Sequence, residues 1–221
     1  MQKFDTTAPI TTVLSIPAGR VQLIAADRAD TTVEVRPSNP GKSRDVQAAE
    51  RITVNYANGE LRIETPEPKN QLLGHSGSVE VTVQLPVGSR VEAKTGASEL
   101  RAVGRLGDVV FEGAYRDIKI DEAASLRLTA FDGDVTVGRL GGPAEISTAR
   151  GDIRIDEALR GSVVLTTQVG NISVTTPAGV SATLDAGTGQ GRVSNALKND
   201  GTPELDIRAT TNQGDITARS L

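Results

Sequence analysis

The sequence contains no cysteine and no tryptophan, and aromatic side chains of any kind are scarce. Its 221 residues include three Phe and two Tyr, so aromatics make up 2% of the chain. The lack of cysteine excludes disulfide bonds and thiolate metal sites. A formal net charge of −4 lacks the basic excess of nucleic-acid-binding domains, and few rings are available to stack on bases. We therefore expect no nucleic-acid partner and a core of Val, Ile, Leu and Ala.

Long apolar runs are missing as well. No segment approaches the roughly eighteen apolar residues that a transmembrane helix needs. The N-terminal stretch "MQKFDTTAPITTVLSIPAGR" lacks the apolar region of a signal peptide. We therefore expect no membrane insertion and a cytoplasmic location, with the cell surface as the alternative if a leader has been removed.

Glycine, in contrast, recurs at regular intervals. The segments "FDGDVTVGRL", "ARGDIRIDEA" and "QVGNISVTTP" share a Gly, then Asp or Asn, then two β-branched residues separated by one polar residue. The Gly supplies a turn conformation that other residues resist, and the Asp or Asn side chain can bond the turn backbone. Equivalent corner positions, 17 to 23 residues apart, are Ser98, Arg116, Gly133, Gly151, Gly170, Gly191 and Gly214.

A repeat near twenty residues with two-residue alternation predicts a solenoid with two short strands in each coil. When coils stack about 4.8 Å apart, their strands pair in parallel and inward side chains form continuous columns. Two such columns are predicted, one of Val135, Ile153 and Ile172, the other of Leu128, Ile146 and Leu165. The segment "ITVNYANGELRI" fits the same template around Gly59.

The predicted fold class is therefore all-β, a single-stranded β-helix with mostly parallel coils of about 17–23 residues. We expect one domain over residues 1–221, with regular repeats in 91–221 and less regular coils in 1–90. Two insertions, 37–50 and 66–78, interrupt the N-terminal part, and the second half of the first is expected to form one or two helical turns.

Several short motifs carry a family resemblance. They are the bends "SIPAGRV" and "QLPVGSRV", the serial G-D-[IV]-x-[IV] corners and "DRADTTVEVRP" at residues 27–37. Together they resemble a bacterial family of β-strand-repeat proteins described as putative adhesins, a domain of unknown function. The resemblance covers nearly the whole chain. It implies a single-stranded β-helix or roll and supplies no catalytic, cofactor-binding or metal-ligating residues.

An outward column of acids is the sharpest candidate site. It includes Asp117, Asp134, Asp152, Asn171 and Asp215. Because Ca²⁺ binds several oxygen ligands, one interpretation is a calcium ladder. Each corner supplies a single carboxylate, however, and Arg or Lys flanks the column. We therefore expect turn-capping acids and no metal site.

Three further motifs suggest chemistry only weakly. His75 is the one histidine, and a serine–histidine mechanism would also need an orienting group and an oxyanion hole. The "GTGQGR" segment at 187–192 resembles a phosphate loop but lacks the following Gly-Lys-Ser/Thr, so we interpret it as a solenoid corner. Polysaccharide cleavage commonly uses aromatic platforms, and the candidates are Phe4, Tyr56, Phe111, Tyr115 and Phe131. We expect no catalytic residue and no cofactor.

Three functions remain open: a non-enzymatic module that binds itself or a protein partner through stacked strands, an exported surface adhesin, or a β-helix enzyme acting on polysaccharide. The C-terminal segment "LDIRATTNQGDITARSL" still follows the repeat, with Ile207, Ala209, Ile216 and Ala218 inward. It contains no proline that would block strand pairing. We therefore expect it to form the open end of the stack and to dock on another copy or on a partner's strand.

Overall fold

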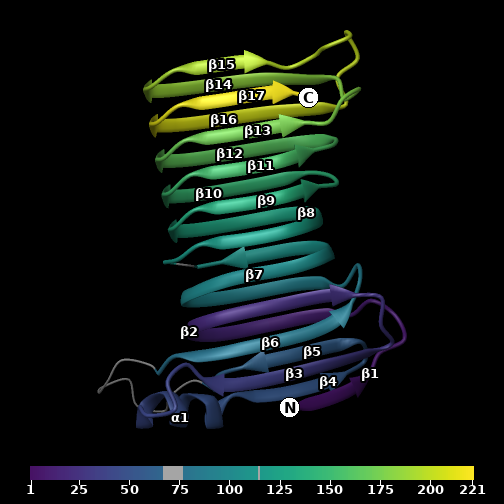
Figure 1. Cartoon of the computed structure of the whole chain (residues 1–221), viewed down its shortest axis with the longest axis vertical. Helices are drawn as coiled ribbons and strands as arrows, with labels where there is room; N and C mark the ends of the chain where they lie inside the picture. The colour runs from purple at the N-terminus through teal and green to yellow at the C-terminus, as the bar shows by residue number, and fades with distance from the viewer. Residues whose placement is uncertain (67–76, 114) are drawn as a thin grey trace.

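The computed structural model describes residues 1–66, 77–113 and 115–221, and these form an all-β chain with one short helix (Figure 1). The N-terminal elements are β1 (Gln2–Asp5), β2 (Thr11–Ala26), β3 (Asp30–Pro37), α1 (Ser43–Arg51), β4 (Thr53–Ala57), β5 (Glu60–Glu64), β6 (Val79–Pro86) and β7 (Arg90–Glu112). The later strands are β8 (Ile118–Asp132), β9 (Val135–Leu140), β10 (Ala144–Arg150), β11 (Ile153–Ala158), β12 (Gly161–Val169), β13 (Ile172–Thr176), β14 (Ala182–Gln190), β15 (Val193–Ala196), β16 (Leu205–Gln213) and β17 (Ile216–Ser220).

The regular part of the chain winds in coils, each made of two consecutive strands that pair in parallel with the coils on either side (Figure 1). Val135 pairs with Ile153, and Ile153 with Ile172. Leu128, Ile146 and Leu165 are matched in the same way in the other row of strands. All six side chains are buried. The predicted register and the mostly parallel, all-β fold class are therefore confirmed.

Close stacking at the corners explains the recurring glycines. Gly151 and Gly170 have φ values of +134° and +152°, a region that residues with a Cβ rarely adopt. A Cβ added at Gly170 would collide with the carbonyl oxygen of Gly151 in the preceding coil. Glycine is therefore needed at this corner because φ is positive there and because the preceding coil lies too close to leave room for a Cβ.

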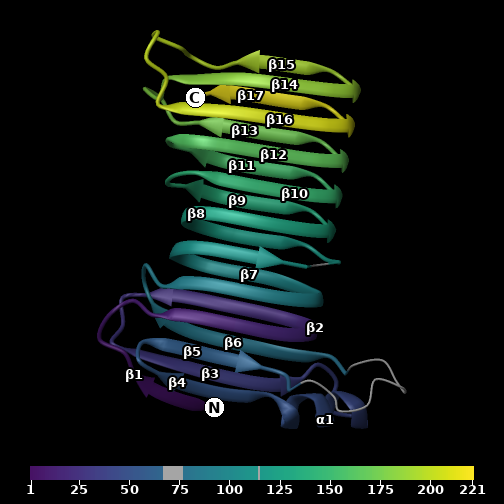
Figure 2. The ribbon, with the colours of Figure 1, turned by 180° about the vertical axis from the view of Figure 1, so that it is seen from behind.

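The C-terminal strands do not lie at the end of the stack, so the prediction that they form its open end is wrong. β16 pairs with β12 on one side and with β14 on the other, and β17 lies in the same way between β13 and β15. Figures 1 and 2 show β16 and β17 one coil below β14 and β15. After β13 the chain passes over one coil position, forms β14 and β15, and returns through residues 197–204 to fill the gap.

Differences in apolar content between the two coils account for this order. Ile207 and Ile216, in β16 and β17, are each 1% exposed, as the sequence predicted for inward positions. β15 instead offers Val193 and the polar Asn195 at the positions where β17 has Ile216 and Ala218. Placing the more apolar coil inside the stack buries more surface, worth about 25 cal/mol per Å².

The strands at the N-terminal end pair in both directions. β2 lies between β7 on one side and β5 and β6 on the other, all in parallel. Beyond it, the pairs β1–β3, β3–β6 and β4–β5 are antiparallel. The β4–β5 connection is a tight hairpin at Asn58 and Gly59, whose φ values are +52° and +79°. An Asn-Gly pair favours this turn, so the assignment of Gly59 to a coil corner is wrong.

The helix α1 occupies the first predicted insertion and packs against β3 and β6. Its Asp45 carboxylate accepts a 3.0 Å hydrogen bond from the Ser78 backbone N–H, which ties the helix to the chain entering β6. Most of the second insertion lies outside the described residues. Among those that the structure describes, no helix is long and apolar enough to cross a bilayer.

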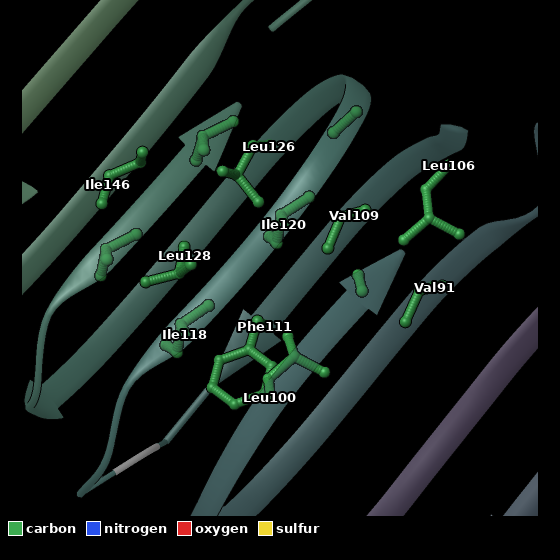
Figure 3. Packing of buried hydrophobic residues seen from close by; sticks show 14 of the residues in the cluster. Val91, Leu100, Leu106, Val109, Phe111, Ile118, Ile120, Leu126, Leu128 and Ile146 are labelled. Carbon is green, nitrogen blue, oxygen red and sulfur yellow. The ribbon is translucent and has the colours of Figure 1, made fainter. Parts of the chain in front are cut away.

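Buried apolar side chains form one cluster that runs along the stack. Figure 3 shows part of it, where Val109 and Phe111 of β7 lie beside Ile118, Ile120 and other inward residues of β8. Phe111 is the largest fully buried side chain. The core is otherwise aliphatic, as the composition predicted.

Candidate functional site

The outward acids at the corners form a ladder of hydrogen bonds from one coil to the next. Asp134 Oδ1 accepts a bond from the Asp152 backbone N–H at 2.8 Å, and Asp152 Oδ1 accepts one from the Asn171 N–H at 2.7 Å. The ladder continues through Asn171 to Asp215 and from Asp215 to Arg192, each at 2.8 Å. It follows the spatial order of the coils, with Asp215 before Arg192.

A second ladder runs along the inner side of the same corners. The hydroxyl of Thr167 donates to the carbonyl oxygen of Gly151 at 3.1 Å, and that of Thr211 donates to Gly170 at 3.0 Å. Thr188 makes the equivalent bond to Gly214 at 2.9 Å. Burying a hydroxyl is costly unless it is paired, so these bonds explain why threonine tolerates an inward position.

Both ladders use the corner polar groups to join coils. Each bridging aspartate presents one oxygen to a backbone N–H. Within residues 1–66, 77–113 and 115–221, no three His, Asp or Glu side chains gather in an arrangement that could hold a metal ion. The absence of a tight calcium site remains a prediction.

The other sequence candidates are dispersed. His75 lies outside the described residues. The "GTGQGR" segment divides between β14 and the corner at Gly191, where φ is +153°. Tyr115 and Phe131 are 55% and 61% exposed, and their rings are 5.3 Å apart at one corner. Apart from Arg192, whose N–H is the last donor of the acid ladder, none of the described candidates lies in that ladder, so the structure does not assemble them with the acids into one site.

A different feature stands out at the C-terminal end of the stack, in the coil formed by β14 and β15 (the end coil, residues 182–196). In the two coils before it, the N–H of the corner glycine donates to the next coil. Gly170 bonds to Gln213 O and Gly214 to Gln190 O, both at 2.9 Å. Gly191 is the end coil's own corner, and in the part of the chain that the structure describes its N–H has no acceptor.

In the same two coils, the first residue of the second strand also donates its backbone N–H to the next coil. Ile172 N–H donates to Asp215 O at 2.9 Å, and Ile216 N–H donates to Arg192 O at 2.8 Å. Val193 is the equivalent residue of the end coil, and β15 pairs only with β17 among the described strands. Its N–H is therefore directed beyond the stack. The end coil thus presents free backbone donors beside an apolar side chain that is 46% exposed.

Within the described residues, the chain itself covers only one corner of the end coil. Ala182 N–H donates to Lys198 O at 3.0 Å, and Lys198 N–H donates to the Ser220 hydroxyl at 2.9 Å. Residues 197–204 therefore protect the beginning of β14. The remainder of β14 pairs only with β16 among the described strands, so it is a free sheet edge.

The N-terminal end is closed by side chains and a helix. The rings of Phe4 and Tyr56 lie 5.4 Å apart, and both pack against the core. Ala48 and Ala49 of α1, together with Ile52, also pack there. The outermost strands, β1 and β4, pair antiparallel with their neighbours, unlike the parallel coils at the other end. The two ends of the stack therefore differ in how well they are capped.

Solved structures of similar shape support the fold. A putative adhesin from Bacteroides fragilis has a TM-score of 0.58 at 14% identity, with 98% of this chain and 95% of that one covered. A putative adhesin from Parabacteroides distasonis has a TM-score of 0.52 at 13% identity, with the same coverage. At such identities the likeness shows the fold alone.

A comparison with the curated proteins gave no match. A family model does match, and it covers residues 12–220, nearly the whole length of the chain. The bends, the Gly-Asp corners and the coils described above all lie within that range. This agrees with the resemblance found in the sequence, and the chain belongs to the Toastrack DUF4097 family, a domain of unknown function.

Proposed function

We propose that this protein is a non-enzymatic interaction module, a single-domain, single-stranded β-solenoid that binds an extended protein strand at its end coil. One observation carries the proposal: the N–H groups of Gly191 and Val193 continue a hydrogen-bonding pattern whose next acceptor is missing among the described residues. An edge of this kind is a template for strand addition.

The chemistry of the end coil suits such a partner. Main-chain bonds give affinity in strand addition, while side chains facing the added strand give specificity. Each backbone bond contributes a net of about 0.5–1.5 kcal/mol. The half-buried Leu184 and Ala186 and the exposed Val193 favour a strand with small apolar residues at alternate positions.

A labelled peptide tests this proposal. The sequence of β16, Leu205–Gln213, is a suitable probe because β16 is the strand with which β14 already pairs. We expect saturable binding by fluorescence anisotropy, and we expect Val193→Lys to weaken it at least about tenfold, since a charge on the end face opposes strand stacking.

Val169→Lys is the matched control. Val169 is 44% exposed, almost the same as Val193, but it ends β12 on the flank of the stack. We expect this variant to bind like the parent. Equal binding by all three proteins, or no binding by the parent at concentrations at which it is monomeric, would contradict the proposal.

A second candidate is an exported surface adhesin. The structural neighbours from Bacteroides fragilis and Parabacteroides distasonis are described as putative adhesins, which favours it. Labelling of intact cells of the native host with a membrane-impermeant reagent tests export. Turnover on a panel of polysaccharides would favour instead the third function, an enzyme acting on glycans.

A further inference from the structure

We infer that the end coil binds the end coil of a second copy of this chain. A twofold axis relates the two copies. This inference rests on the proposed function and adds the identity of the partner. It follows from three features: the difference between the two ends, the shape of the end coil, and its charge.

The difference between the ends decides how copies can join. Head-to-tail stacking would require the N-terminal end to accept the end coil. That end is covered by α1 and by the Phe4–Tyr56 pair, and its outer strands β1 and β4 belong to antiparallel pairs, so it does not present the cross-section of a parallel coil. The open surface can therefore meet only its own equivalent. Such an interface is isologous and closes at two copies, so no filament forms.

The shape of the end coil favours its own copy over a single extended peptide. It presents two strands, β14 and β15 (Figure 2). Leu184 and Ala186 of β14 are partly buried and pack against the core. A lone peptide covers one of these strands. A second end coil has the same cross-section, so it covers β15, the part of β14 that residues 197–204 leave free, and the side chains between them.

The twofold axis fixes the direction of pairing. The twofold rotation inverts the second copy along the stack axis. Each strand of one end coil therefore faces a strand of the other that runs in the opposite direction. Antiparallel pairs form bonds perpendicular to the strands and are slightly more stable per residue than parallel ones. The junction would thus be the only antiparallel pairing at this end, whereas the coils below it are parallel.

Charge does not oppose the contact. Within residues 182–196 the only charged side chains are Asp185 and Arg192, so the end coil carries no net charge. Arg192 N–H is already held by Asp215 Oδ1 at 2.8 Å, which orders the corner before association. Two copies therefore meet without the like-charge repulsion that edge strands commonly use against pairing.

Sedimentation equilibrium over a concentration series from about 1 µM to about 500 µM tests the inference, since a small interface gives concentration-dependent association. We expect a mass that rises from the 23.1 kDa of one chain to twice that value and no further. In parallel, we expect hydrogen exchange at the Gly191 and Val193 amides to slow as concentration rises.

The variants locate the interface. Val193→Lys should remain monomeric across the series, while Val169→Lys should dimerise like the parent. Because Val193 is exposed, the substitution should leave the thermal melting curve in place, which checks that folding is intact. Dimers of Val193→Lys as strong as those of the parent would overturn the inference, and so would assemblies larger than two.

The peptide experiment separates the two proposals. A parent protein that stays monomeric but binds the β16 peptide would overturn the second-copy inference and leave the strand-binding function in place. A parent that stays monomeric and binds no peptide would overturn both.

Discussion

Asp152 Oδ1 accepts a 2.7 Å hydrogen bond from the backbone N–H of Asn171, which lies one coil further along the stack. The same relationship joins Asp134 to Asp152 and Asp215 to Arg192. A column of acids that resembles a binding site in the sequence is thus a device that holds each corner to the next.

Removing one member of this ladder should destabilise the protein modestly. We expect Asp152→Ala to lower the free energy of unfolding by about 0.5–1.5 kcal/mol, because the Asn171 N–H loses its acceptor. Asp152→Asn should lie closer to the parent, since Asn171 itself fills this role toward Asp215. Urea denaturation measures both, and an alanine variant as stable as the parent would argue against the ladder.

A paired substitution at two glycines separates steric collision from backbone strain. Both Gly170 and Gly179 have positive φ, +152° and +89°. An added Cβ collides with the Gly151 carbonyl at Gly170, whereas it meets nothing within 4 Å at Gly179. We expect Gly170→Ala to cost about 2 kcal/mol or more and Gly179→Ala about 1 kcal/mol. Equal denaturation midpoints would show that coil stacking does not set the requirement.

The register of the coils could be predicted from the sequence because it is local. Ile153 and Ile155 follow Gly151 at fixed spacing, and every coil that repeats this spacing places its apolar residues at the same height. A slip of one residue would turn all of them outward, so the pattern leaves one solution.

The order of the coils could not be predicted in the same way. The segment from Leu205 to Ser220 matches the template as well as any other, and nothing local states which coil it will stack on. Its position depends on a comparison between two coils: the segment buries more apolar surface inside the stack than the less apolar end coil would bury there. The sequence therefore predicts the open edge at the wrong strands. The Asn58–Gly59 pair is a hairpin signal, but the segment around it also matches the corner template.

Ile153 should be intolerant of charge. It is fully buried between Val135 and Ile172 in the neighbouring coils. We expect Ile153→Asp to cost about 4 kcal/mol or more, because the carboxylate would be buried without a partner. Thr166→Asp is the control, since Thr166 is exposed and pairs with uncharged Ser147 and Thr210. A denaturation midpoint for Ile153→Asp equal to that of the control would contradict the inward register.

Calcium should leave the protein unchanged. Asp134 and Asp152 each use one oxygen for the next coil's backbone N–H, whereas Ca²⁺ needs six to eight oxygen ligands. A calcium site would add about 2.7 kcal/mol to the free energy of unfolding at a Ca²⁺ concentration about one hundred times its Kd. We expect no shift in Tm on adding millimolar Ca²⁺. A large shift that a chelator reverses would show that the acid column binds metal.

Residues 197–204, which cover the start of β14, should be held less firmly in acid. The titration of Asp200 reports this change. The backbone N–H of Thr202 donates to Asp200 Oδ1 at 3.0 Å and lowers the pKa of this carboxyl below its usual 3.8, with smaller contributions from the Ser181 and Thr202 hydroxyls. Because the folded-state pKa is the lower one, this stabilisation is present above about pH 4 and is lost as the pH falls through the folded-state value. We expect an NMR titration to place the Asp200 midpoint below 3.8.

Thr202→Val tests the cause of that shift. The substitution removes the hydroxyl but keeps the backbone N–H, which is the larger influence on the Asp200 pKa. The midpoint should therefore rise only part of the way toward 3.8. A parent midpoint at or above 3.8 would mean that the Asp200 contacts do not persist in solution. The hydrogen bond from Asp200 N–H to the Ser181 hydroxyl, 3.1 Å long, would then also be in doubt. The beginning of β14 would in that case join the open edge, and the surface available for pairing would be longer than the one described.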